Sequence, residues 1–228
     1  MEVCFFLAGD AARGHSAFDG TRISRLQSAA REVEGLRRFV LHLPSGQDTR
    51  APCCVTQWYF DDLDLLEAAL DTKGALHAAA DIIARCASNV TLRQQAMAVR
   101  RFIAPHRHRP DALGERCTYL VSYEGDAVDF NAWLTHYMTN HPPLMTQLPG
   151  IRELEIYTRI DNRSQLRHAR ATAMQRNKVV FDDLASLNAA LASPIRVQMK
   201  HDFDSFPPYS GATPHYPMRS IYSNLTQE

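Results

Sequence analysis

The chain has no excess of charge of either sign. Its 25 Lys and Arg residues balance its 25 Asp and Glu residues, and the pI is about 7.1. Nucleic acids and anionic membranes attract strongly basic surfaces. The pairs Arg37-Arg38 and Arg100-Arg101 are too short to form such a surface. We therefore expect neither nucleic acid nor membrane among its partners.

Cysteine is scarce and its spacing forms no pattern. The number of cysteines, five, is odd, and no Cys-x-x-Cys pair occurs, which argues against a disulfide framework and a thiolate zinc site. No apolar run approaches the ~20 residues of a membrane span, and no basic segment precedes the first apolar run. The sequence predicts a cytoplasmic protein with reduced, buried thiols at Cys4, Cys53, Cys54, Cys86 and Cys117.

Motifs for common cofactors and nucleophiles are also missing. The sequence has no G-x-G-x-x-G, no Walker loop, no G-x-S-x-G and no C-x-x-C-H haem signature. His106 and His108 form an H-x-H pair, but no set of His, Asp and Glu has the converging spacing of a zinc or iron site. We predict no cofactor and no metal, and leave open a haem or metal site built from distant residues.

What the chain does have is a repeat. Residues 60–70 and 181–191 share eight of eleven positions, at an offset of 121 residues, about half the 228-residue chain. Shorter matches at offsets of 113 and 115 extend it, and the second copy carries its extra residues chiefly across 159–177. This pattern predicts a duplicated half. The predicted domains are 1–104, a linker over 105–115, and 116–228.

Each half is expected to read strand, helix, strand, strand, helix, strand, which is the ferredoxin-like βαββαβ motif. Such a sheet leaves one apolar face bare, and a bare face must be buried. We therefore predict an α+β fold in which the two sheets pack face to face and enclose a barrel-like cavity within one chain. Association of two chains into a homodimer through exposed sheet edges stays open.

Local signals place several boundaries. Phe130, Trp133, Leu134 and Tyr137 fall on one helical face, which His141-Pro142-Pro143 is expected to interrupt. Asp129 or Asn131 is expected to cap this helix, and Asp61-Asp62 and Asp182-Asp183 to cap the repeated one. Residues 83–93 are ambiguous. The predicted strands and helices cover 3–7, 21–33, 36–43, 54–60, 62–71 and 94–102, then 117–123, 130–137, 144–148, 152–159, 178–181, 182–192 and 217–222.

The second half resembles a known family. The residues that carry the likeness are Tyr119–Tyr123, Phe130-x-x-Trp133, His141-Pro142-Pro143-Leu144 and Leu148-Pro149-Gly150-Ile151, followed by Phe181–Leu184, Leu191–Pro194 and Asp202. In this order and spacing they resemble the EthD-type branch of the dimeric α+β barrel superfamily. The resemblance implies a tandem fusion of two ferredoxin-like units. It leaves activity open among monooxygenases, lactone isomerases, cyclases and haem enzymes.

His141 is the leading candidate for catalysis. Its counterpart in the first half, at an offset of 115, is Leu26, which has no acid–base chemistry. The resemblance implies that His141 faces the cavity, where an imidazole with an ordinary pKa of ~6.5 could act as acid or base. A histidine that only caps its helix remains the alternative. The first half would then hold a degenerate site.

Other candidates surround this assignment. Tyr137 or Tyr123 could donate a hydrogen bond to a substrate oxygen, although each could equally be a core aromatic residue. Arg152 could hold a developing oxyanion. His201 replaces Ala80 of the first half, whereas Asp202 matches Asp81 and is expected to be structural.

Three functions follow from these residues. The first is a cofactor-independent lyase or isomerase that moves a proton on a small hydrophobic, aromatic or lactone-like compound in aromatic catabolism, or else a monooxygenase of phenolic or polyketide-like substrates. The second is a non-catalytic small-molecule-binding accessory protein. The third is a haem or metal enzyme. Polar groups beside His141 would favour an enzyme, and a purely apolar cavity would favour binding.

Overall fold

The computed structural model describes residues 1–11, 18–45, 50–71, 74–85, 90–103, 114–223 and 225. The strands in this part of the chain are β1 (Val3–Ala11), β2 (Leu36–Pro44), β3 (Cys54–Phe60), β4 (Val90–Phe102), β5 (Glu115–Tyr123), β6 (Glu153–Arg159), β7 (Ala169–Arg170), β8 (Gln175–Phe181) and β9 (His215–Ser223). The helices are α1 (Gly20–Arg31), α2 (Leu63–Ala69), α3 (Leu76–Ala84), α4 (Phe130–Met145), α5 (Leu184–Leu191) and α6 (Ile195–Asp204).

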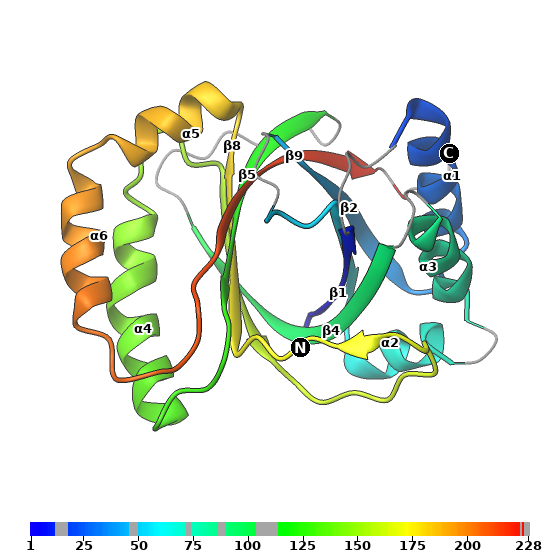
Figure 1. Ribbon diagram of the computed structural model, residues 1–228, viewed down its shortest axis with the longest axis horizontal. Coiled ribbons are helices and arrows are strands. Elements are labelled where there is room, and N and C mark those ends of the chain that lie inside the picture. The colour runs from blue at the N-terminus through cyan, green and yellow to red at the C-terminus, as the bar shows by residue number, and fades with distance from the viewer. Residues whose placement is uncertain are drawn as a thin grey trace.

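Eight of these strands close into an antiparallel barrel. Their order is β1-β3-β2-β9-β5-β8-β6-β4, and β4 also pairs with β1. Figure 1 shows the ring of strands between two groups of helices, α1 to α3 on one side and α4 to α6 on the other. The predicted α+β class and barrel are confirmed. Because the ring closes, its eight strands offer no free edge for pairing between two copies, the route that the sequence had left open.

The first half (β1 to β4) and the second half (β5 to β9) arrange their main strands alike. The order is β4-β1-β3-β2 in the first half and β9-β5-β8-β6 in the second. The halves join where β2 pairs with β9 and where β4 pairs with β6. The predicted linker over 105–115 falls mostly outside the described residues, and His106, His108 and Cys86 lie outside them as well.

Aspartate caps set several helix starts as predicted. Asp62 and Asp183 have the same backbone angles, φ −152° and ψ 176°, and each carboxylate accepts a hydrogen bond from the backbone N–H three residues on. Asp129 caps α4 in the same way. This satisfies N–H groups that a helix start leaves unpaired.

The prediction that His141-Pro142-Pro143 interrupts its helix is wrong. The helix α4 runs through both prolines to Met145. A proline ring fits helical φ, although it removes one backbone hydrogen bond and crowds the carbonyl four residues before it. Both prolines lie near the end of α4, so little helix follows them. The carbonyl of Pro143 is then used by the side chains of Thr146 and Gln147. His141 is consequently a residue within the helix, in the turn before its end.

Two helices were not predicted, α3 and α6. Ser193-Pro194 does end α5, but Pro194 then stands at the start of α6, where its missing N–H costs nothing. The ambiguous residues 83–93 hold the end of α3 and the start of β4. Each half thus has a pair of packed helices on its outer face, α1 with α3 and α4 with α6.

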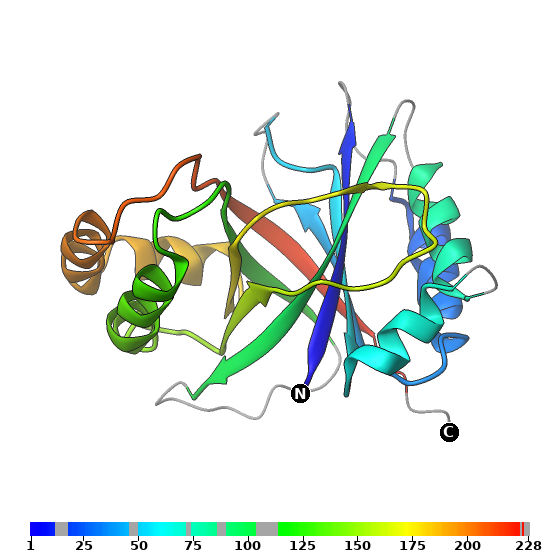
Figure 2. The ribbon, with the colours of Figure 1, turned by 90° about the horizontal axis from the view of Figure 1, so that it is seen from below.

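Part of the predicted insertion, from residue 160 to 174, reaches over to the first half, as Figure 2 shows for the yellow chain segment. The Arg163 guanidinium pairs with the carboxylate of Glu67 at 2.6 Å. The Gln165 N–H bonds the Leu70 carbonyl at 3.0 Å, and Ser164 bonds Gln94 at 2.7 Å. The extra residues of the second half therefore stabilise its contact with the first.

Three apolar clusters fill the molecule. One lies between α1 to α3 and the first half's strands, one between α4 to α6 and the second half's strands, and one inside the barrel. Cys4, Cys53, Cys54 and Cys117 are buried, in line with the expectation. No helix in the described ranges is long and apolar enough to cross a membrane.

Candidate functional site

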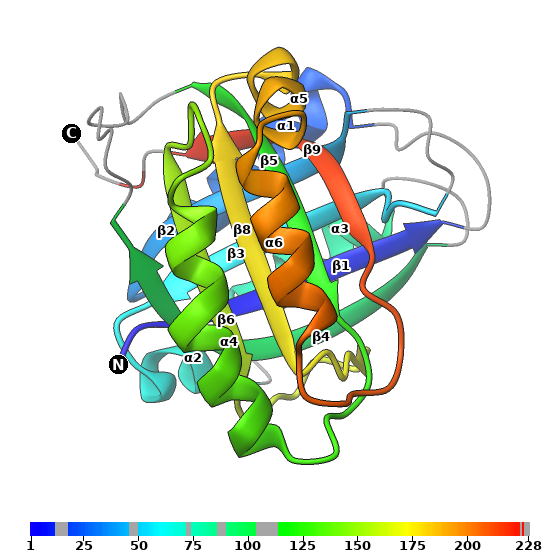
Figure 3. The same ribbon diagram turned by 90° about the vertical axis from the view of Figure 1, so that its left-hand side faces the viewer.

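The outer face of the second half carries a cluster of aromatic side chains. Figure 3 shows α4 and α6 side by side over β5, β6, β8 and β9. Under them lie the rings of Tyr123, Trp133, Tyr137, Phe206 and Tyr209, which we call the aromatic layer. Trp133 stacks on Tyr137 with 5.2 Å between ring centroids, and Tyr123 meets both rings edge-on.

His141 borders the aromatic layer and forms a pair with Asp202 across the two helices. The Nδ1 atom of His141 lies 2.7 Å from Oδ2 of Asp202, and the two side chains are only 7% and 10% exposed. Nε2 of His136 lies 3.3 Å from the other carboxylate oxygen. His141 Nε2 makes no hydrogen bond with the described residues.

Electrostatics favour a neutral His141 ring. Burial lowers the pKa of His141, and the bond to Asp202 offsets this only in part. With Nδ1–H donated to the carboxylate, Nε2 carries the lone pair. A carboxylate that fixes the tautomer of a neutral histidine is the arrangement that a general base requires.

Tyr137 lies beside this pair, and Tyr123 contacts Tyr137. The Tyr137 ring is 5.2 Å from His141, and its hydroxyl donates to Met145 Sδ at 3.6 Å. Burial raises the pKa of both phenols. Both therefore stay protonated and are suited to donate a hydrogen bond rather than to act as bases.

Two buried polar atoms near Tyr123 lack a partner among the described residues. They are Nε1 of Trp133, an N–H donor, and Oε1 of Gln175, an acceptor. Trp133 contacts Tyr123 directly, and Gln175 is the strand neighbour of Tyr123 between β5 and β8. An unpaired buried polar group costs about 1–3 kcal/mol. Such groups in an aromatic layer point to a ligand or water with polar atoms of its own.

The remaining two sequence candidates lie elsewhere. Arg152 is paired with Asp182 through two bonds, with Nε 2.9 Å from Oδ1. His201 is exposed on α6. The structure thus brings together His141, Tyr137 and Tyr123, and shows no contact between this group and Arg152 or His201.

Sequence reasoning missed the unpaired N–H group of Trp133, the unpaired oxygen of Gln175, and the contact between Asp202 and His141. It assigned Asp202 a structural role because Asp81 matches it. In the structure the two differ, since Asp81 is 71% exposed and contacts Arg85. His141 also lies on the helix side of the sheet rather than facing the barrel interior as expected.

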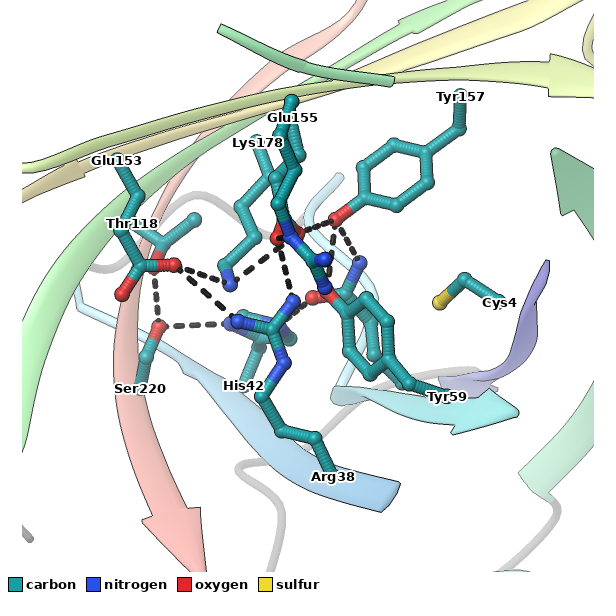
Figure 4. Close-up of polar contacts among 12 residues, drawn as sticks. Cys4, Arg38, His42, Tyr59, Thr118, Glu153, Glu155, Tyr157, Lys178 and Ser220 are labelled. Atoms are coloured by element: carbon teal, nitrogen blue, oxygen red, sulfur yellow. Dashed lines mark hydrogen bonds and ion pairs between the residues drawn. The ribbon is translucent and has the colours of Figure 1, made fainter. Parts of the chain in front are cut away.

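The barrel interior holds a second set of polar residues, shown in Figure 4. Glu155, 2% exposed, accepts hydrogen bonds from Tyr59 at 2.7 Å and from Arg101 at 2.9 Å, and it also pairs with Arg38. Lys178 lies 2.8 Å from Glu153 and 3.5 Å from Glu155. Burial opposes the charge of Glu155, but Lys178 and Arg38 outweigh it and hold the pKa of Glu155 well below its usual range.

His42 belongs to this interior network, and each of its ring nitrogens has a hydrogen-bond partner. Nδ1 lies 2.6 Å from the Ser220 hydroxyl, and Nε2 lies 2.7 Å from the Gln57 amide oxygen. Burial lowers the pKa of His42 to about 3. Because both ring nitrogens are occupied, His42 is a structural residue. No group of three or more metal-binding side chains occurs in the described part of the chain.

No family model matches the chain and no curated protein matches it, but solved structures do. The chain is similar to an anthrone oxidase-like protein, with a TM-score of 0.64 and 10% identity over 96% of this chain and 91% of that one. It is also similar to proteins described as putative monooxygenases from Lactobacillus acidophilus and Fusobacterium nucleatum. Each has a TM-score of 0.59 and 10% identity, over 98% and 97% of this chain and 96% and 94% of those.

These likenesses extend over nearly the whole of each chain, and they confirm the predicted α+β barrel fold. At such low identity the likeness establishes the fold alone. The chemistry has to be argued from the side chains.

Proposed function

We propose that the protein is a cofactor-independent enzyme that removes a proton from a small aromatic compound, with His141 as the base. The observation that carries this proposal is the buried His141–Asp202 pair beside the aromatic layer. Asp202 holds the Nδ1 proton and so directs the Nε2 lone pair outward. Tyr137 and Trp133 supply nearby O–H and N–H groups for an oxygen that gains charge in the reaction.

The polar groups around His141 also favour an enzyme over a plain binding protein. A site that only bound apolar compounds would gain nothing from a buried His–Asp pair or an unpaired indole N–H, because both cost free energy on burial. If packing were the only requirement, we would expect apolar side chains at these positions, as in the first half, where they fill the layer between α1 and α3.

The fate of the deprotonated compound decides the reaction class. In a lyase or isomerase, the electron pair left by the proton expels a leaving group, or a proton returns at a different atom. The likeness to an anthrone oxidase-like protein and to putative monooxygenases favours a second outcome, in which the carbanion or phenolate reacts with O₂. For an anthrone the balance is one CH₂ group plus O₂ giving one C=O group plus H₂O. Both outcomes begin with the same step at His141.

We further propose that the fold arose by tandem duplication of a ferredoxin-like unit of EthD type, with the catalytic residues kept in the second half only. The identical strand order of the halves and the repeated Asp caps support this. Catabolism of aromatic compounds is the setting in which such a proton-removing enzyme would act.

Anthrone is a suitable probe because its CH₂ protons are acidic. Under argon in D₂O, the wild-type protein should speed exchange of these protons, followed by NMR, and under air it should speed formation of anthraquinone. His141→Ala should lose both activities while keeping its circular dichroism spectrum. Exchange that persists in His141→Ala would overturn the proposal, as would the absence of exchange with anthrone and with phenolic and lactone probes in the wild type.

A further inference from the structure

The barrel contains a cavity next to the Glu155 network, on the other side of the Phe6–Tyr157 contact. Its volume is about 150 Å³. Phe6, Val55 and Leu120 contribute apolar surface to its wall. The charged side chains of the wall are Asp10, Arg50, Arg93, Glu124 and Arg176. Phe6 meets Tyr157 edge-on at 4.9 Å, and Tyr157 belongs to the network. This contact therefore separates the cavity from the ion pairs beyond it.

Arg176 is the residue that distinguishes this cavity. It comes from β8, and its guanidinium carbon lies 5.4 Å from the centre of the Phe6 ring. Its Nε donates to the Gln95 amide oxygen at 3.2 Å. No carboxylate lies within ion-pair distance of Arg176 among the described residues, and its two terminal nitrogens make no hydrogen bond there. Burial lowers the pKa of Arg176, but an arginine remains charged.

Other cations of the barrel have carboxylate partners. Arg38 and Lys178 are paired with Glu155 and Glu153. At the cavity itself, Arg93 binds Asp10 through two nitrogens, with Nε 2.9 Å from the carboxylate. The other acidic residue of the wall, Glu124, accepts a bond from Ser122. The Arg176 charge is thus left for a partner that is not part of these pairs.

We infer that this cavity binds a small aromatic carboxylate, with the carboxylate on the terminal nitrogens of Arg176 and the ring against Phe6 and Leu120. A cavity of about 150 Å³ is large enough for a single benzene-sized ring. A guanidinium presents two parallel N–H groups that match a carboxylate. A planar anion therefore satisfies the volume, the apolar wall and the charge together.

This binding site is separate from the one proposed for catalysis. Arg176 points into the barrel, whereas its neighbour Gln175 points to the helix side and bonds Asn177 there. The two sites lie back to back across β8, so each can be tested without the other. The inference does not rest on the proposed function.

Benzoate is the probe, and benzyl alcohol is its neutral counterpart. Calorimetric titration should show benzoate binding to the wild type and binding that is weaker by roughly 10-fold or more in Arg176→Gln, because a hydrogen bond to a charged group contributes about 1.5–3 kcal/mol. Arg176→Lys should fall between the two. Arg167→Gln removes an exposed arginine of the same half and should bind benzoate like the wild type.

Two further measurements protect the test from a folding artefact. Arg176→Gln should be at least as heat-stable as the wild type without ligand, since it removes a desolvated charge. Benzoate should shift the NMR signals of Phe6 and Leu120 and should bind His141→Ala unchanged. The inference is overturned if Arg176→Gln binds benzoate like the wild type, if benzyl alcohol binds equally well, or if His141→Ala loses benzoate binding.

Discussion

The helix layers of the two halves cover equivalent strands but pack in different ways. Between α1 and α3 the buried side chains are apolar, with Leu26, Leu76 and Ile83 fully buried. Between α4 and α6 the corresponding layer buries the pair His141–Asp202. The first half shows that this architecture needs no polar pair in its helix layer. Because burying ionisable groups costs free energy, their presence in the second half calls for a role other than packing.

The largest expected effect comes from removing the His141 ring. His141→Ala should reduce the rate of proton removal by about 100-fold or more, the usual contribution of a general base, and should leave the fold intact. The matching change in the first half is Leu26→Ala. It should cost about 2–5 kcal/mol of unfolding free energy through the cavity it creates, yet leave the rate per folded molecule unchanged. Denaturant unfolding and anthrone exchange measure the two quantities.

Asp202→Asn tests the partner of the base. The carboxylate raises the pKa of His141, so its loss should lower that pKa further and move the acidic limb of the rate profile to lower pH. The rate itself should fall about 10-fold or more with the loss of a charged hydrogen bond. Asp81→Asn, at the exposed counterpart, should change neither the rate nor the profile. An unmoved limb in Asp202→Asn would assign Asp202 a purely structural role.

The buried residues His42 and His141 provide a third contrast, in how the free energy of unfolding depends on pH. His42 has a folded pKa of about 3, against ~6.5 when unfolded. Between these two pH values, His42 is therefore protonated in the unfolded chain and neutral in the native protein. The resulting stability is complete above about pH 6.5 and is lost as the pH falls toward 3, by up to about 1.4 kcal/mol per pH unit. His42→Gln should flatten this slope in urea unfolding measured between pH 6.5 and 4.

A slope that is unchanged by His42→Gln would show that other groups carry the acid sensitivity. His141 should contribute in the same direction, since its folded pKa is also lowered. Comparing the pH slope of stability and the rate of proton removal in His42→Gln and His141→Ala distinguishes a structural histidine from a catalytic one.

The smallest expected effect contrasts the two tryptophans. Trp58 of the first half donates its indole N–H to Thr56 at 2.9 Å, whereas the N–H of Trp133 has no partner among the described residues. Trp58→Phe should lose about 1 kcal/mol of stability. Trp133→Phe should lose less or even gain stability, and should raise the KM for an oxygen-bearing substrate a few-fold. Equal losses from both changes would contradict a ligand-binding role for Trp133.

Local signals in the sequence predicted much of the fold, since caps, alternation and the repeat act within a few residues. They failed at α4, because two prolines tolerated at the end of a helix look like a break. They also failed at α6, whose buried residues are few and include the polar Asp202. The pairing of His141 with Asp202 spans 61 positions and depends on how α4 packs on α6. Tyr137 and His141 could be found because one helix carries both.

The barrel interior was the harder part to predict. Alternation marked residues 152–159 as a strand, but alternation alone does not say which set of side chains faces outward. Here Glu155 and Tyr157 point inward, where Arg38 and Tyr59 of the other half meet them. The local sequence around Glu155 and Tyr157 does not identify Arg38 and Tyr59 as their partners, because these side chains meet only when the barrel closes.

That closure also determines how the chain can be divided. The first half contributes Glu2, Arg38 and Arg101, and the second contributes Glu153, Glu155 and Lys178, to a single set of three carboxylates and three cations. Expressed alone, the first half would retain one unmatched cation, and the second one unmatched carboxylate. Each stranded ion would cost several kcal/mol if it stayed buried. The halves are therefore not interchangeable modules, and gene fission or recombination between them would have to preserve both sides of the charge set at once.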